Sequence, residues 1–238
     1  MIMARSNFFV IYNGQMNTEF NVSVRYRPDM PTPAREYETI KVEGRDGELY
    51  EDKGTYADIT IEIDFNFKAE PDEWQERFRK IKKWLYGEND RRLIMSDDME
   101  YFYNVKRVQI ETAERVIKRI GRFTAKFTCE PYAYTKGGYT ITELESILVN
   151  QFEKAYPTYY IYGSGEMELT VNGNTVTAAV DGSLTIDTKL GLCYNAGQVI
   201  ENAALSGDYD NLTLPEGTNT FAYTAGFEVR IKPNWRSI

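Results

Sequence analysis

Acidic side chains at every second position are the residues of this chain best suited to chemistry. Glu62 and Asp64 fall on one face of a predicted strand, and Glu166 and Glu168 do the same in the second half. Two carboxylates held at a fixed separation carry out glycoside hydrolysis. The same alternation is also found on the polar face of an ordinary strand. The sequence shows no neighbouring group that would orient either pair of carboxylates for catalysis. A glycan hydrolase therefore stands as the least favoured of three hypotheses.

No other pattern supports catalysis or a cofactor. The chain has no histidine, which removes every mechanism that uses an imidazole base and most zinc and non-haem iron sites. The Gly-Ser-Gly run at residues 163–165 lacks the Lys-Ser/Thr that completes a phosphate-binding loop. The acidic loop at residues 208–211 lacks the spaced ligands of an EF-hand. We therefore expect no enzyme, with no catalytic residues, no cofactor and no metal.

The charge distribution argues against a specific nucleic-acid partner and indicates two domains. The net charge is −8, whereas nucleic-acid binders usually carry a basic face. Residues 1–134 hold 22 Lys and Arg against 24 Asp and Glu, and residues 135–238 hold 6 against 12.

No apolar run approaches the roughly 18 residues that span a bilayer, and the N-terminus lacks signal-peptide features. We expect a soluble protein made in a cytoplasm, with no membrane partner.

A long alternating segment dominates the first half. Isoleucine and phenylalanine occupy every second position of Ile59–Phe67, which predicts a strand over Thr55–Lys68 with one buried face. A shorter strand is predicted at Tyr37–Glu43, and Gly44–Gly47 predicts the turn between them, because glycine adopts positive φ. Three prolines within residues 28–33 predict stiff, extended backbone that crosses a surface or reaches toward a neighbour.

One helix is predicted over residues 71–86. Pro71 suits its first turn, and its apolar stripe consists of Trp74, Phe78, Ile81 and Leu85. Its outer face is basic and is interpreted as solvated or as a donor of ion pairs to a neighbour; it carries Arg77, Arg79, Lys80, Lys82 and Lys83. Further strands are predicted at Phe8–Tyr12, Phe20–Tyr26, Arg92–Met95, Tyr101–Glu111 and Gly121–Glu130. Pro131 is expected to end the last of them, because proline donates no hydrogen bond to a ladder. Cys129 is expected to be buried, and no disulfide is expected between Cys129 and Cys193.

The second half predicts a β-sandwich. Short strands rich in threonine and tyrosine alternate with turn residues, and Asn172-Gly173 predicts a tight hairpin between Glu166–Asn172 and Asn174–Val180. We therefore divide the chain into a β-rich domain over residues 1–135, a linker over 136–156 and a sandwich over 157–238. Four tyrosines between residues 156 and 162 favour a core or protein interface, although tyrosines also stack on sugars. A carbohydrate-binding adhesin is thus the second hypothesis.

The order of these features resembles a known family. A proline-rich stretch precedes GRDGELYEDKGTY, an alternating strand, WQERFRKIKKWL and GRFTAKFTCEPYAY; then follow PTYYIYGSGEMELTVNG, SLTIDTK and FEVRIKPNWR. This order resembles the distal tail proteins (Dit) of long-tailed, non-contractile bacteriophages and prophages. The resemblance covers nearly the whole chain and is strongest over Gly44–Tyr134.

The resemblance implies a mainly β fold, with an α+β N-terminal domain and a galectin-like C-terminal β-sandwich. It implies a non-enzymatic virion component of the tail tip, or baseplate, assembled in the bacterial host cytoplasm. Six copies would form a ring joining the tail-tube protein to the tail-associated hub protein, and in some phages the C-terminal domains carry receptor-binding proteins.

A ring needs contacts whose rotation closes, and long strands with exposed edges suit such contacts. We expect Phe20–Arg35, Tyr37–Phe67 and Tyr101–Glu111 to cooperate in them. The candidate contact residues are the turn residues Gly44 and Gly47, the charges Arg45 and Asp46 between them, and Glu62 and Asp64 on the long strand.

Overall fold

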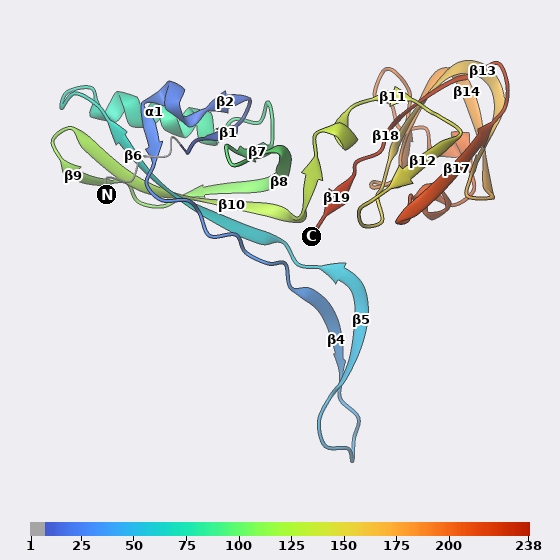
Figure 1. The fold of residues 1–238 in the computed structure, drawn as a ribbon, viewed down its shortest axis with the longest axis horizontal. Helices are drawn as coiled ribbons and strands as arrows, with labels where there is room; N and C mark the ends of the chain where they lie inside the picture. The colour runs from blue at the N-terminus through green and yellow to red at the C-terminus, as the bar shows by residue number, and fades with distance from the viewer. Residues whose placement is uncertain (1–7) are drawn as a thin grey trace. The chain divides into compact units, whose positions relative to one another are not determined.

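A computed structural model describes residues 8–238. The chain is mainly β, as predicted, and one α-helix is present among these residues (Figure 1). It divides into two compact units, with the boundary between Ala133 and Tyr134. The described residues contain no helix that is long and apolar enough to cross a membrane. Because residues 1–7 lie outside the described part, the N-terminal unit is described from Phe8 onward.

The N-terminal unit is built on one antiparallel sheet. Its strands lie in the order β2-β1-β7-β8-β10-β6-β3, and β9 pairs with β10. The strands are β1 (Val10–Tyr12), β2 (Gln15–Met16), β3 (Val22–Val24), β6 (Ile59–Lys68), β7 (Arg92–Met95), β8 (Asp98–Ile110), β9 (Glu114–Ile117) and β10 (Ile120–Thr135). A separate pair, β4 (Arg35–Ile40) and β5 (Leu49–Tyr56), forms its own two-stranded sheet.

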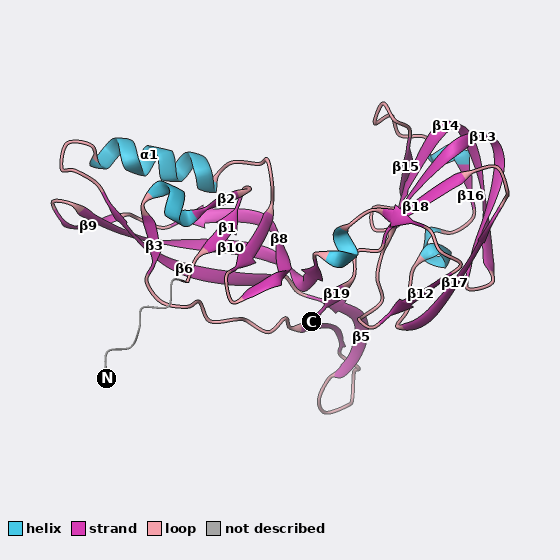
Figure 2. Cartoon of the chain, turned by 45° about the horizontal axis from the view of Figure 1, so that its top comes forward, coloured by secondary structure: helices cyan, strands magenta, loops and turns pink. Residues whose placement is uncertain are grey.

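The alternating strand buries its apolar face as predicted. Ile63 lies opposite Ala125 and Phe65 opposite Phe123, and all four side chains are buried. The single helix, α1 (Trp74–Leu85), covers this face (Figure 2): the ring centroids of Phe67 and Trp74 are 5.1 Å apart. The opposite face of the sheet carries polar side chains.

The predicted helix over 71–86 is shorter, Trp74–Leu85, and several strand ends are shifted by a few residues. Two larger differences concern strand continuity. The predicted strand Thr55–Lys68 is broken at Ala57, because β5 pairs with β4 whereas β6 pairs with β3 and β10. Pro131 does not end β10, which continues to Thr135. The ladder between β10 and β6 already ends where Cys129 faces Ile59, so the missing N–H of Pro131 costs no bond of that ladder.

The C-terminal unit is organised around one long hairpin. Strands β13 (Thr158–Val171) and β14 (Asn174–Asp187) pair along their whole length. Asn172 and Gly173 join them with φ of 51° and 84°, as the predicted two-residue turn requires. The other strands are β11 (Thr142–Glu143), β12 (Ile147–Asn150), β15 (Leu192–Tyr194), β16 (Leu205–Ser206), β17 (Gly217–Tyr223), β18 (Glu228–Lys232) and β19 (Arg236–Ser237).

The predicted linker, residues 136–156, is structured. It contains β11, which pairs with β18, and β12, which pairs with β17. Leu144 and Ala155 are buried in the core of the C-terminal unit. The segment is weakly patterned in sequence because its strands are short and only a few side chains turn inward, yet it belongs to this unit.

Both cysteines are buried and free, Cys129 in the N-terminal unit and Cys193 in the C-terminal unit. Burial raises the pKa of the Cys129 thiol to about 12, and burial also raises the pKa of Cys193. The thiolate is the reactive form, and its fraction at pH 8 falls as the pKa rises. We expect neither thiol to react with a disulfide reagent at pH 8 in the native protein and both to react in guanidinium. Rapid native labelling of either thiol would contradict this placement.

Candidate subunit interface

The six predicted contact residues lie on two different elements. Gly44–Gly47 forms the loop between β4 and β5, where Gly44 and Gly47 have φ of +79° and +82°. This confirms the turn. Glu62 and Asp64 lie on β6, inside the sheet of the N-terminal unit. Whether Gly44, Arg45, Asp46 and Gly47 contact another copy stays a prediction.

The strands β4 and β5 and their loop, residues 35–56, form a two-stranded ribbon that we call the arm. Figure 1 shows it as a separate ribbon, and its strands pair only with each other among residues 8–238. Every residue from 34 to 55 is exposed. The exposed side chains include five large apolar ones, Tyr37, Ile40, Val42, Leu49 and Tyr50, and Tyr50 is 67% exposed. The arm therefore has no core of its own.

One face of the arm is aromatic and internally paired. The rings of Tyr37 and Tyr50 meet edge to face with centroids 6.3 Å apart. Arg35 Nε donates to Asp52 Oδ1 at 2.9 Å. This bond, with a second from the backbone N–H of Gly54, holds the pKa of the Asp52 carboxyl below its usual range. These contacts fix the base of the arm, next to the pair Arg35–Tyr56.

The other face is acidic, and we call it the acidic face; by strand alternation it carries Glu36, Glu38, Ile40, Leu49, Glu51 and Lys53. Glu38 lies directly opposite Glu51. Like charges at directly opposed positions destabilise a ribbon. In the described part of the chain, Glu38 has one ion pair, with Lys53 at 3.8 Å, and Glu51 has none. The acidic face is therefore under-compensated in a single copy.

Glu62 and Asp64 both bond within the unit. Lys126 Nζ lies 3.0 Å from Glu62 and 2.9 Å from Glu111, and these two bonds, the one to Glu111 first, raise the pKa of Lys126. Thr124 Oγ1 donates to Asp64 Oδ1 at 2.6 Å. The two carboxylates thus tie β6 to β10, as the polar face of an ordinary strand does.

The proline-rich segment runs beside this polar face. Arg25 N–H donates to the carbonyl oxygen of Asp64 at 2.8 Å, which extends the ladder between β3 and β6. Residues 26–31 then border an open groove of about 630 Å³, whose other wall is Thr60, Glu62 and Asp64. Part of the stretch expected to reach for a neighbour therefore crosses its own sheet.

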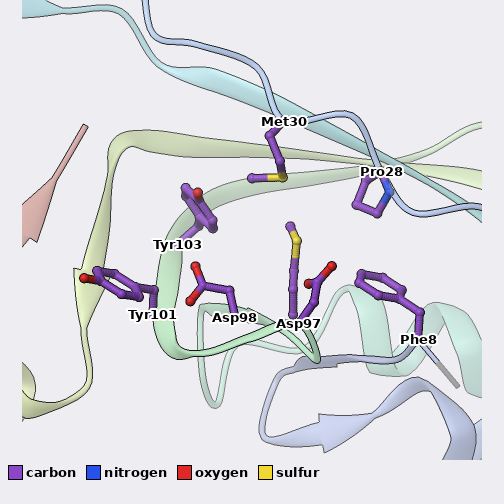
Figure 3. Close-up of a pocket in the computed structure, with 8 residues that line it drawn as sticks. Phe8, Pro28, Met30, Asp97, Asp98, Tyr101 and Tyr103 are labelled. Carbon is purple, nitrogen blue, oxygen red and sulfur yellow. The ribbon is translucent and has the colours of Figure 1, made fainter. Parts of the chain in front are cut away.

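A smaller hollow of about 270 Å³ lies beside the turn between β7 and β8 (Figure 3). It is lined by Phe8, Pro28, Met30, Met95, Asp97, Asp98, Tyr101 and Tyr103. Asp97 faces Arg27 at 3.5 Å, whereas burial and then repulsion by Asp97 and Glu100 raise the pKa of Asp98. Aromatic and methionine walls with an acidic edge suit a side chain of a protein partner.

The outer face of α1 is basic, as predicted. Arg79, Lys80, Lys82 and Lys83 are exposed, whereas Arg77 is half-buried. Lys80 pairs with Glu76 on the same helix at 2.7 Å. Within residues 8–238, neither Arg79 nor Lys83 has an ion pair, and the exposed ring of Tyr86 follows them at the end of the helix. We call Arg79, Lys82, Lys83 and Tyr86 the basic stripe.

The tyrosine cluster does not form one platform for a sugar. Tyr159 is fully buried, and its hydroxyl donates to the carbonyl oxygen of Leu212 at 2.9 Å. Tyr160 is half-buried, and burial raises its pKa to about 12. Tyr162 is exposed. The core interpretation is thus confirmed for Tyr159. This ring is not accessible for stacking on a sugar, which weakens the glycan-binding hypothesis.

Comparison with known families finds a similarity in the N-terminal half of the chain. Residues 16–129 match the model of the phage tail protein RIFT-related domain. This segment is therefore similar to a phage tail protein domain. It contains the arm, the helix α1, the acidic face and the basic stripe, whereas Phe8 and the tyrosine cluster lie outside it.

The solved structures extend the likeness beyond the phage tail domain. The Dit protein (gp 19.1) of SPP1 has the same fold, with a TM-score of 0.66 and 16% identity over 94% of this chain and 96% of the SPP1 chain. That protein is described as a paradigm of the hub adsorption apparatus in phages that infect Gram-positive bacteria. No curated protein matches the chain. The two comparisons confirm the predicted resemblance to phage distal tail proteins.

Proposed function

We propose that this chain is a distal tail protein, which forms a ring of six copies at the tip of a phage tail. Both comparisons support a structural role in a phage tail. The observation that supports a ring of several copies is the arm. Residues 34 to 55 are all exposed, with five large apolar side chains among them. Isolated two-stranded ribbons are marginally stable in water. The arm therefore requires a surface on another molecule.

A second copy of this chain is the partner that best explains the arm. The surface on an arm differs from any surface that receives it, so the contact is heterologous, and heterologous contacts close into rings when their rotation permits. A permanent contact usually buries more than about 2,000 Å². We therefore propose that the interface between copies includes two further segments besides the arm. These are Phe20–Arg35 and Tyr101–Glu111, which border the two hollows.

The proposed ring would also bind two other tail proteins. One side of it would bind the tail-tube protein and the other the tail-associated hub protein, as part of a hub adsorption apparatus. The C-terminal unit, a galectin-like domain in this proposal, would carry receptor-binding proteins where the phage has them. The protein would be assembled in the bacterial host cytoplasm and act in the virion tail tip, with no reaction to catalyse.

Negative-stain electron microscopy of the purified chain, alone and with a tail-tube protein, tests this proposal. We expect six-fold rings with a central pore, and stacking of these rings on the ends of tubes. Rings can dissociate on dilution, so the sample is examined over a range of concentrations. Single two-lobed particles at every concentration, with and without tubes, would contradict the proposed ring.

A further inference from the structure

Two surfaces of the N-terminal unit have opposite charge that is only partly compensated within one copy. On the acidic face, Glu38 lies opposite Glu51, and the only described ion pair at this position is the 3.8 Å contact between Glu38 and Lys53. On α1, Arg79 and Lys83 are one helical turn apart and have no ion pair among residues 8–238. Each surface therefore holds charges that would be better satisfied by the other.

The apolar parts of the two surfaces also correspond. Ile40 and Leu49 are a directly opposed pair on the acidic face, two residues closer to the tip than Glu38 and Glu51. Both are exposed, as is the ring of Tyr86 beside Lys83. Each surface thus presents an apolar patch next to like charges, and an interface with an apolar centre and charged rim needs that arrangement on both sides.

We propose that the acidic face of the arm of one copy docks on the basic stripe of α1 in the next copy. Glu38 and Glu51 would face Arg79 and Lys83, and Ile40 and Leu49 would pack against Tyr86. This inference rests on the proposed ring and adds to it the surface that receives the arm. It also gives the basic face of the helix a binding partner, which is the carboxylate-bearing β-ribbon of another copy.

Charge reversal tests the pairing without touching a buried group. We expect E38K/E51K and R79E/K83E, each alone, to weaken self-association on the order of 10- to 100-fold, because like charges then face each other. An equimolar mixture of the two variants should restore assembly, since each swapped arm meets an oppositely swapped helix on its neighbour. The chain that carries all four substitutions should assemble as well. Sedimentation velocity over a concentration series measures each case.

Engineered cysteines give a second measurement that does not depend on charge. E51C/K83C should form disulfide-linked multimers under mild oxidation, whereas E51C alone and K83C alone should give far less. The background is low because Cys129 and Cys193 are buried. A disulfide within one copy would migrate as a monomer, which separates contact between copies from contact within a chain.

The outcomes distinguish this inference from the proposed function. If the native chain assembles and either double reversal assembles equally well, or if the mixture stays dissociated, the docking inference is overturned and the ring stands. A native chain that stays monomeric at every concentration overturns both. Restoration by the mixture, together with cysteine-linked multimers, supports the docking of the arm on α1.

Discussion

A chain in which residues 36–55 are replaced by Asn-Gly is expected to fold and to lose assembly. Arg35 and Tyr56 are directly opposed in the ladder, so a two-residue turn can join them. The replacement removes five exposed apolar side chains that we expect a neighbour to bury. Loss of about 3 kcal/mol of this burial would weaken self-association about 100-fold. Analytical ultracentrifugation of both chains measures the difference.

A matched pair of variants separates the arm from exposed apolar surface in general. Tyr37→Ser with Tyr50→Ser removes two exposed apolar side chains from the arm, and Val116→Ser with Ile117→Ser removes two from β9. We expect the first pair to weaken assembly and the second to leave it within about threefold. An armless chain that forms particles of the same mass as the full chain would show that the arm is not the contact.

Trp84→Ala is expected to destabilise the N-terminal unit by about 3–5 kcal/mol. Trp84 is buried, stacks on Phe20 with ring centroids 5.0 Å apart and meets Phe65 edge to face at 6.2 Å. Its indole N–H also donates to the carbonyl oxygen of Tyr12 at 2.7 Å, so the alanine variant leaves that carbonyl without this partner.

Urea unfolding monitored by helical circular dichroism measures this loss, because α1 is the one α-helix in residues 8–238. Trp84→Phe is the control: it keeps an aromatic ring between Phe20 and Phe65 and should cost less than the alanine variant. Tyr86→Ala, at an exposed position just after the helix, should cost under about 1 kcal/mol. Equal stability of Trp84→Ala and the native chain would place Trp84 outside the core.

Local patterns in the sequence predicted the parts of the fold that local physics decides. The alternation from Ile59 to Phe67 predicted a strand with one buried face, and Asn172-Gly173 predicted a two-residue turn. Both depend on backbone geometry and on side chains within a few residues of each other. The same reasoning underestimated α1: the stripe omitted Trp84, because its burial depends on contacts with Tyr12 and Phe20 far along the chain.

The failures share a physical cause, which is that strand partners are non-local. No residue between Thr55 and Asp58 shows that the chain changes partner at Ala57. Likewise, whether Pro131 interrupts a ladder depends on where β6 begins, which lies more than sixty residues away in sequence. Residues 136–156 looked like a linker because short strands leave too few positions to show a period.

The candidate interface was predictable only in part. The turn at Gly44–Gly47 follows from its glycines. The exposure of both faces of β4 and β5 does not, because residues such as Tyr37, Ile40 and Leu49 resemble those of a half-buried strand. The hollow beside Asp97 and Asp98 was not predicted, since its other walls include Phe8 and Pro28, which are distant in sequence.

Hydrogen exchange of the arm as a function of protein concentration tests the central claim most directly. Backbone amides of residues 35–56 should exchange rapidly in dilute protein, because the ribbon has no core and opens readily. As copies associate, these amides should become protected, together with those at the exposed end of α1, while the core of the C-terminal unit is unchanged. Assembled particles whose arm amides exchange as fast as in the monomer would contradict the claim that the arm joins neighbouring copies.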